Sequence, residues 1–375
     1  FLRGCVAAIA WFGLQTYTGS LALTIILGKI FPGFLEIGDG AQILGIGIPQ
    51  LISFTIFWVL NVAIGLGGGG ILNKFTAVLS PLIYVVVIGM TVWAISAAGG
   101  LGNILAFSPQ AAEDFNPVFV FLMILNSVIA VWAAPGASVS DFTQNATSTA
   151  TQRRGQTLSL LVAYVVFAFC SVVILIGASL ATGTQHWDIT TVIDSWDSVP
   201  LVVCATGVFL LTTISTNATG NIIPAGYQLA ALFPKKLTYR SGVVIASVIS
   251  FAIMPWKLME NSSSIYLFLN TIGAVLGPVA GVMIAHYYFV ANRQIDLDAL
   301  YMDMNDQDKS NPYQGVNVPA YIATIAALVI SLSGQFIPAL SFISGVSWFA
   351  GSISAFVIYL AIRKFSSSQA NVEAK

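Results

Sequence analysis

Charged residues are scarce in this sequence. Asp, Glu, Lys and Arg make up 8% of the 375 residues, whereas 57% are apolar. Soluble domains carry about a quarter of charged residues, so a soluble globular protein is excluded. The formal net charge of −1 and the scattered basic residues give no basis for nucleic acid as a partner. The sequence therefore predicts a protein whose surroundings are the lipid bilayer.

Residues that bind metals or form disulfides are also few. Cys5, Cys170 and Cys204 lie in apolar stretches without a CxxC pair, and His186 is far from His286. Neither a disulfide framework nor a metal cluster is indicated. The apolar runs contain no HExxH motif, paired aspartates or serine-histidine arrangement, so no catalytic residues and no cofactor are expected. A channel would need a continuous polar pore with repeated filter elements, and the sequence shows no such repeat.

Apolar runs long enough to cross a bilayer recur along the whole chain. Crossing ~30 Å of hydrocarbon takes roughly 20 residues in a helix. The runs are too long for strands and do not alternate, so helices are the membrane-compatible choice. They are residues 5–30, 48–66, 74–98, 117–140, 156–182, 199–222, 241–259, 264–290, 318–333 and 341–363. The sequence thus predicts an all-α membrane protein with about ten transmembrane helices in one domain, residues 1–375.

The basic residues predict how these helices are oriented. When the loops are assigned alternately to the two sides, only Lys29 and Lys257 fall on one side. The other side receives Arg3, Lys74, Arg153, Arg154, Lys235, Lys236, Arg240, Arg293, Lys309, Arg363, Lys364 and Lys375. Because basic loops stay in the cytoplasm, we expect both ends of this multi-pass chain to be cytoplasmic, in the plasma membrane.

Polar side chains within the apolar runs are candidates for binding, because a polar group without a partner is costly in hydrocarbon. In the first run, Trp11 and Gln15 are four residues apart and share a helix face. A flat ligand stacked on the indole could reach the carboxamide. An interfacial anchor is the alternative for this tryptophan.

Two further runs have unusual composition. Trp132 is followed by Pro135 and Gly136, which should interrupt the fourth run and expose backbone polar groups. In the sixth run, Ser215 and Thr216 offer neutral oxygens that suit a small hard cation, and Asn221 follows nearby. Bonding of the two hydroxyls back to their own helix is the alternative.

Taken in order, these segments resemble the nucleobase:cation symporter family one, the permeases for hydantoins, allantoin, cytosine and uracil. The resemblance runs along nearly the whole chain. Besides Trp11 to Gln15, Trp132 and residues 215–221, it is carried by Leu232-Phe-Pro-Lys-Lys236, Met254-Pro-Trp256, Leu276-Gly-Pro-Val-Ala-Gly281, Leu297-Asp-Ala-Leu-Tyr301 and Tyr313-Gln-Gly-Val-Asn317. These later segments are closest to the hydantoin and allantoin branch.

The resemblance implies the sodium-coupled, LeuT-like fold of two inverted five-helix repeats, in which the first run is the family's third helix. It therefore also implies that two helices precede Phe1. Trp11 and Trp132 would stack on the substrate ring, and Gln15 and Asn221 would pair with its polar edges. Sodium would be held by Ser215, Thr216 and the carbonyl group of Thr212. These residues come from the family's pattern and not from the spacing alone.

We therefore expect a symporter that imports a neutral nitrogen heterocycle such as allantoin or a hydantoin, coupled to sodium or protons. A carboxamide suits such a ligand because it offers donors and acceptors without a charge. A uracil, cytosine or purine permease is the first alternative. An amino-acid carrier of the same fold is the second.

Overall fold

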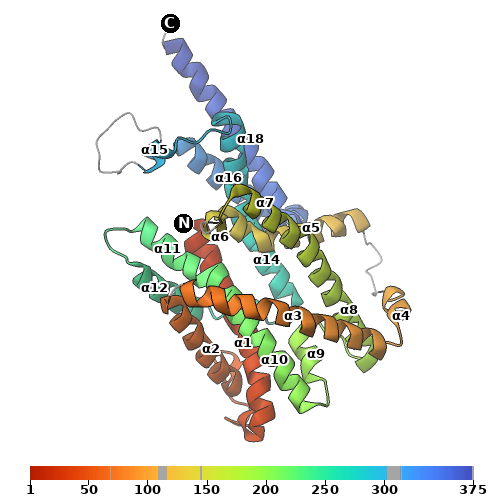
Figure 1. Ribbon diagram of the computed structural model, residues 1–375. Helices are drawn as coiled ribbons and strands as arrows, with labels where there is room; N and C mark the ends of the chain where they lie inside the picture. Colours follow the sequence, from red (N-terminus) through yellow and green to blue (C-terminus); the bar gives the residue numbers. More distant parts are fainter. Residues whose placement is uncertain (68, 109–115, 144–145, 302–312, 314, 374–375) are drawn as a thin grey trace. The chain divides into compact units, whose positions relative to one another are not determined.

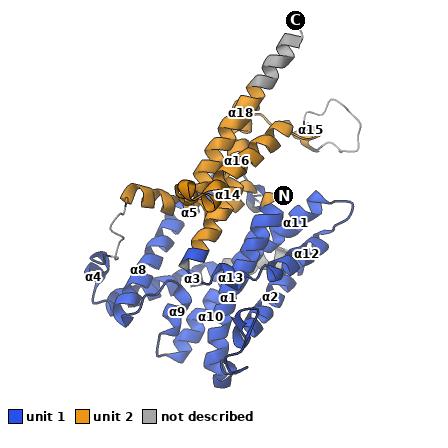
Figure 2. Cartoon of the chain, turned by 180° about the vertical axis from the view of Figure 1, so that it is seen from behind, with its two compact units in different colours: residues 1, 3–113, 140–264 blue, residues 2, 114–139, 265–375 orange. Residues whose placement is uncertain are grey.

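The structure is a computed structural model that describes residues 1–67, 69–108, 116–143, 146–301, 313 and 315–373. The chain forms two compact units, which are coloured separately in Figure 2. Unit 1 comprises residues 1, 3–113 and 140–264, and unit 2 comprises residues 2, 114–139 and 265–375. Each unit is described by itself. The single domain expected from the sequence stays a prediction.

Unit 1 is built almost entirely from helices (Figure 1). Its longer elements are α1 (Ala8–Ile30), α2 (Ile48–Gly67), α3 (Gly69–Ala97), α7 (Thr149–Leu158), α8 (Tyr164–Thr182), α10 (Val199–Asn217), α11 (Ile223–Leu232) and α12 (Tyr239–Ala252). The short ones are α4 (Leu101–Leu105), α6 (Ser140–Thr143), α9 (Ile189–Asp194), α13 (Pro255–Leu258), the 3-10 turn η2 (Pro32–Phe34) and the strands β1 (Gln42–Ile43) and β2 (Ile46–Gly47). Three π-helical turns are η1 (Leu2–Ala7), η3 (Ser159–Ala163) and η4 (Ala218–Ile222).

Unit 2 contains the remaining helices. They are α5 (Pro117–Ala137), α14 (Ser262–Ala285, of which residues 262–264 belong to unit 1), η5 (His286–Val290), α15 (Leu297–Tyr301), α16 (Val318–Phe336), η6 (Pro338–Leu340), α17 (Ser341–Gly345) and α18 (Ser347–Glu373). Within it, α14 approaches the backbone of α18 closely. A Cβ atom on Gly281 would lie 2.1 Å from the carbonyl oxygen of Ser352. Glycine is therefore required for this contact.

Eight of the described helices are long and apolar enough to cross a membrane, and α17 with α18 adds a ninth if the bent pair is one span. The expectation of a helical membrane protein is confirmed. The segment expected at 241–259 differs, because α12 has 14 residues and ends at Ala252. The cause is Pro255, which disfavours helical backbone at Met254; this residue has a φ of 49°.

The segment expected at 341–363 is also not one straight helix. It is bent by 92° between α17 and α18. The interruption expected at Pro135 comes slightly later than the proline itself. Helix α5 continues through Pro135 and ends at Ala137. Proline removes one backbone donor without stopping the residues that follow it directly, so the break falls after Gly136.

The core of unit 1 forms where α1 packs against α2, α10 and α12 (Figure 1). Phe12 of α1 is fully buried against small residues of its neighbours. Gly13 lies at the closest approach, since a Cβ atom there would be 2.9 Å from the carbonyl oxygen of Ser250. This tight packing fixes α1, which carries Trp11 and Gln15, against α12.

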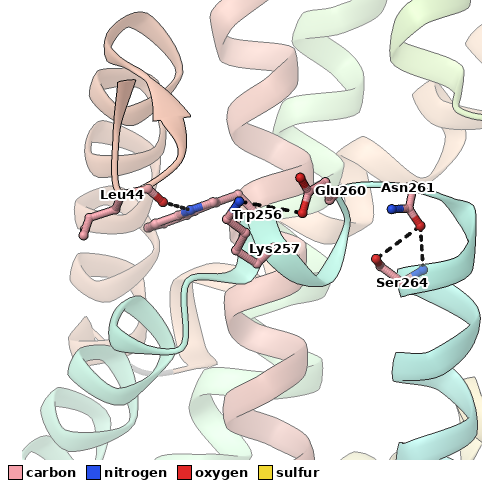
Figure 3. A network of polar contacts seen from close by, with 6 residues as sticks. All are labelled: Leu44, Trp256, Lys257, Glu260, Asn261 and Ser264. Carbon is pink, nitrogen blue, oxygen red and sulfur yellow. Dashed lines mark hydrogen bonds and ion pairs between the residues drawn. The ribbon is translucent and has the colours of Figure 1, made fainter. Parts of the chain in front are cut away.

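A loop cluster closes the end of α1 that carries Lys29. The indole N–H of Trp256 donates to the carbonyl of Leu44 in the turn between β1 and β2, at 3.0 Å (Figure 3). Beside it, Lys257 lies 3.7 Å from the carboxylate of Glu260 (Figure 3). Asn261 then accepts a bond from the backbone N–H of Ser264 at 2.9 Å, which caps the first turn of α14.

Candidate functional site

Gln15 and Asn221, two of the predicted substrate-binding residues, come together in unit 1. The side-chain Nδ2 of Asn221 donates to Oε1 of Gln15 at 2.9 Å. Asn221 is 7% exposed, and Gln15 is half-buried. The two amides lie 206 positions apart in sequence and meet because α1 packs along α10 and η4. Together they form a hydrogen-bonded carboxamide pair inside the helix bundle.

Asn221 lies in a π-helical turn. In η4 the backbone N–H of Ile223 bonds to the carbonyl of Ala218, five residues back. Pro224 follows and has no N–H to return to the carbonyl of Gly220. The Nη2 of Arg3 donates to this carbonyl instead, at 2.8 Å. Turns of this kind widen a helix locally and recur at functional sites. Here the turn displaces Asn221 from the register of α10.

A cavity of about 290 Å³ lies beside Gln15, between α1, α3, α8, α9 and α10. Its volume is at the small end of the range for ligand pockets. Most of the lining is apolar, and no charged side chain contributes to it. Its hydroxyl and amide groups belong to Gln15, Thr18, Ser171, Thr212, Thr213 and Thr216. Asn221 does not line this cavity itself and is connected to it through Gln15.

Two of the three predicted sodium ligands, Thr212 and Thr216, lie on the wall of the same cavity. The hydroxyl of Thr216 donates to the carbonyls of Thr212 and Thr213, at 3.1 and 3.2 Å. Because the proton of this hydroxyl is committed, its oxygen keeps lone pairs for a cation. Ser215 is buried, at 3% exposure. Neutral oxygens of this kind fit a small hard cation. The bond of Thr216 back to its own helix also agrees with the alternative stated above, so the sodium site stays a prediction.

The two tryptophans fall in different units. Trp11 is half-buried on α1, one turn before Gln15 and on the same face. Trp132 lies on α5 in unit 2, one turn before the end of that helix, and is 41% exposed. The structure thus joins Gln15 to Asn221 by a hydrogen bond and places Gln15, Thr212 and Thr216 on one cavity. The stacking role of Trp132 stays a prediction.

Two further asparagines extend the carboxamide pair. Asn217 of α10 accepts from Asn221 at 2.9 Å and donates to Asn61 of α2 at 3.2 Å. Both Asn61 and Asn217 are completely buried. Neither residue has a role predicted from the sequence. A signal was present, because Asn61 is a carboxamide in the middle of an apolar run, where such a group needs a partner.

A second cavity in unit 1, of about 520 Å³, has a different character. It lies at the end of α1 that carries Lys29, beside the loop cluster of Figure 3. Charged side chains of both signs line it, among them Asp188, Asp194 and Lys257. Lys29 lies 3.1 Å from the carboxylate of Asp194. Groups of this kind are expected where water reaches the protein, whereas the cavity beside Gln15 suits an uncharged ligand.

Residues 1–353 match the family described as permeases for cytosine/purines, uracil, thiamine and allantoin. A provisionally assigned allantoin permease of Escherichia coli (strain K12) is 52% identical over all 375 residues, which cover 77% of its length. The allantoin permease of Bacillus subtilis (strain 168) is 34% identical over 358 residues, 95% of this chain and 72% of the relative. A hydantoin permease of Microbacterium maritypicum is 26% identical over 356 residues, 90% of this chain and 66% of that protein.

A solved structure has the same fold. Mhp1, a nucleobase-cation-symport-1 family transporter in a closed conformation with bromovinylhydantoin bound, aligns with a TM-score of 0.72 at 21% identity. The alignment covers 98% of this chain and 75% of Mhp1. The likeness confirms the LeuT-like transporter fold expected from the sequence. The relatives are permeases, so the chain is a membrane transport protein and not an enzyme. It belongs to the family of permeases for cytosine, purines, uracil, thiamine and allantoin, the nucleobase:cation symporters.

Proposed function

We propose that this protein imports a neutral, planar, amide-rich heterocycle, with allantoin or a hydantoin as the first candidate. The observation that carries this proposal is the hydrogen-bonded pair of Gln15 and Asn221 beside an uncharged cavity. An ionised substrate would need a compensating charge at this depth. A ureide or hydantoin ring needs only donors and acceptors, which carboxamides supply. The names of the relatives at 52% and 34% identity point to the same substrate class.

The residues that would hold the substrate follow from this proposal. Gln15 and Asn221 pair with the polar edges of the ring, and Trp11 stacks on one face of it. Trp132 contributes the other face. Each contact is of a kind that strengthens when water is excluded, since stacking removes apolar area and buried hydrogen bonds gain from a low dielectric.

Coupling to sodium or protons completes the proposed cycle. Sodium would be held by the carbonyl of Thr212 and the hydroxyls of Ser215 and Thr216, whose oxygens carry no charge. Thr216 and Gln15 line the same cavity, so ion and substrate would bind as neighbours. Each would then increase the affinity for the other, because linkage between two binding sites is reciprocal.

Orientation in the plasma membrane is the last element of the proposal. In unit 1, Lys29 and Lys257 lie at one end, with Asp194 and Glu260 beside them. The sequence assigns the other basic residues to the opposite side, although Lys309 and Lys375 lie outside the described residues. The positive-inside rule then places both chain ends in the cytoplasm.

Uptake by cells that express the protein tests the substrate class. Radiolabelled allantoin and hydantoin should accumulate above the level of vector controls and should compete with each other. Competition by uracil, cytosine or purines alone would favour the nucleobase alternative. Competition by zwitterionic amino acids would favour an amino-acid carrier of the same fold. The absence of uptake or competition by any uncharged ring compound would refute the proposal.

A further inference from the structure

The buried amides of unit 1 form a continuous hydrogen-bonded chain. It starts at Asn61 on α2, passes through Asn217 on α10 and Asn221 on η4, and ends at Gln15 on α1. Its donor–acceptor distances are 3.2, 2.9 and 2.9 Å in that order. These four amides offer more N–H donors and carbonyl acceptors than their contacts use. The orientation of each amide therefore decides which donor or acceptor remains for a ligand.

Backbone carbonyls fix the direction of the first two amides. The Nδ2 of Asn61 donates to the carbonyl of Phe57 at 2.8 Å. The Nδ2 of Asn217 donates to the carbonyl of Phe12 at 3.2 Å and to the hydroxyl oxygen of Thr16 at 3.0 Å. A carbonyl oxygen only accepts. A flipped amide would therefore place oxygen against oxygen in a fully buried site, which is strongly unfavourable.

The orientation of Asn217 then determines the next two residues. Its Oδ1 faces Asn221 and can only accept, so Asn221 must present its amide nitrogen. The same nitrogen also donates to Oε1 of Gln15. What remains is the carbonyl oxygen of Asn221 and the amide nitrogen of Gln15. The chain thus leaves one acceptor and one donor, each on a defined residue.

We propose that Asn217, supported by Asn61, is a positioning residue that holds the amides of Asn221 and Gln15 in this one orientation. The site then selects a substrate by the positions of the N–H and carbonyl groups on its edge. The carbonyl of Asn221 receives a ring N–H, and the amide nitrogen of Gln15 donates to a ring carbonyl. A cyclic amide or ureide presents these two groups side by side. This inference rests on the proposed function and adds which edge the ligand must offer.

Replacement of Asn217 separates positioning from packing. Asn217→Leu removes the acceptor that orients Asn221, so the amide of Asn221 becomes able to turn and offer its nitrogen instead. Asn217→Asp keeps an oxygen toward Asn221 and so keeps the orientation, although it loses the donors of the original amide. Asn126→Leu in unit 2 is the matched control, since Asn126 is also a completely buried amide with side-chain and backbone partners.

The probes are hydantoin and its two ring N-methyl derivatives, each of which lacks one N–H. In the wild-type protein, the derivative that lacks the N–H read by Asn221 should bind at least ~10-fold more weakly than hydantoin, as a site that hydrogen-bonds a ligand group rejects its absence. In Asn217→Leu the ratio should fall to about 2-fold or less, because a turned amide no longer requires this N–H. Asn217→Asp and Asn126→Leu should keep the wild-type ratio even if both are less stable.

Selectivity ratios distinguish this inference from a general loss of structure, since a variant that is merely destabilised lowers all affinities together. A wild-type ratio in Asn217→Leu would overturn the proposal. If this variant does not reach the membrane, the smaller replacement Asn217→Ala removes the same acceptor and should lower the ratio in the same way; an unchanged ratio there would overturn the proposal as well. Failure of the wild-type protein to bind any hydantoin or allantoin would instead refute the proposed function.

Discussion

The two units each bury a cluster of side-chain amides, and the clusters differ in how they end. In unit 2, Asn126 of α5 donates to Oδ1 of Asn270 at 3.2 Å and accepts from the backbone N–H of Trp348 at 2.9 Å. Ser347 donates to the carbonyl of Asn270 at 2.7 Å. In unit 1 the chain that begins at Asn61 ends at Gln15, which lines a cavity.

The difference lies in what each cluster satisfies. Trp348 lies in the first turn of α18, just after the 92° bend, and its backbone N–H has no partner within the helix. Asn126 provides that partner, so the cluster of unit 2 closes on the backbone and holds a helix break. The cluster of unit 1 leaves a donor and an acceptor for a ligand. Under the proposed function, buried amides would thus serve stability where they close on the backbone and recognition where they end at a cavity.

The largest expected effect concerns the amide cluster of unit 2. Asn126→Leu leaves the N–H of Trp348 and the Oδ1 of Asn270 without their partner, and each buried unpaired group costs about 1–3 kcal/mol. We expect a loss of roughly 2 to 4 kcal/mol in unfolding free energy, with unchanged substrate affinity. Thermal unfolding of the detergent-solubilised protein and equilibrium binding of allantoin measure the two quantities. A variant of normal stability with impaired binding would contradict the comparison.

The amide chain of unit 1 should show the opposite pattern, with a larger effect on substrate binding than on stability. Asn221→Ala removes the substrate's partner and one amide of the chain, so substrate binding should weaken by ~1 to 3 kcal/mol, roughly 5- to 150-fold in Kd. Stability should change less than in Asn126→Leu, because Asn217 keeps its contacts with Phe12, Thr16 and Asn61. Titration with labelled substrate measures the effect. Unaltered affinity and uptake would remove Asn221 from the site.

The sequence predicts the helices well because length and apolar composition determine them. Runs 48–66 and 318–333 agree with α2 and α16 to within a few residues at either end. The failure at 241–259 is local, since Pro255 ends a helix that hydropathy alone would continue. The bend before Ser347 has no comparable sequence signal. Beside it the backbone N–H of Trp348 donates to Asn126, which comes from a distant part of the chain.

The candidate site is only partly predictable, because it depends on contacts between distant parts of the chain. Gln15 and Asn221 were found through the family's motifs, and their contact agrees with a shared site. Asn61 was missed although it is a polar residue in an apolar run, because a single sequence does not show which helix it faces. Its partner Asn217 lies 156 positions away. Polar residues in membrane helices thus indicate that a partner exists, whereas tertiary packing decides which one.

The smallest expected effect tests whether sodium binds beside the cavity of unit 1. Ser215→Ala with Thr216→Ala removes two hydroxyl oxygens, of which that of Thr216 lines the cavity, and leaves the amides of Gln15 and Asn221 in place. If sodium binds there, it should raise substrate affinity in the wild-type protein by about fivefold or more, the lower end of typical coupling between two ligands. The double variant should then bind substrate equally with and without sodium, at the affinity of the sodium-free wild-type protein.

Thr91→Ala is the control, because its hydroxyl also bonds back to its own helix, at 2.7 Å from the carbonyl of Val87, and does not line this cavity. It should retain the full response to sodium. Binding measured in sodium and in choline chloride separates the outcomes. A double variant that still responds to sodium would place the ion elsewhere, and a wild-type affinity that ignores sodium would favour protons as the coupling ion.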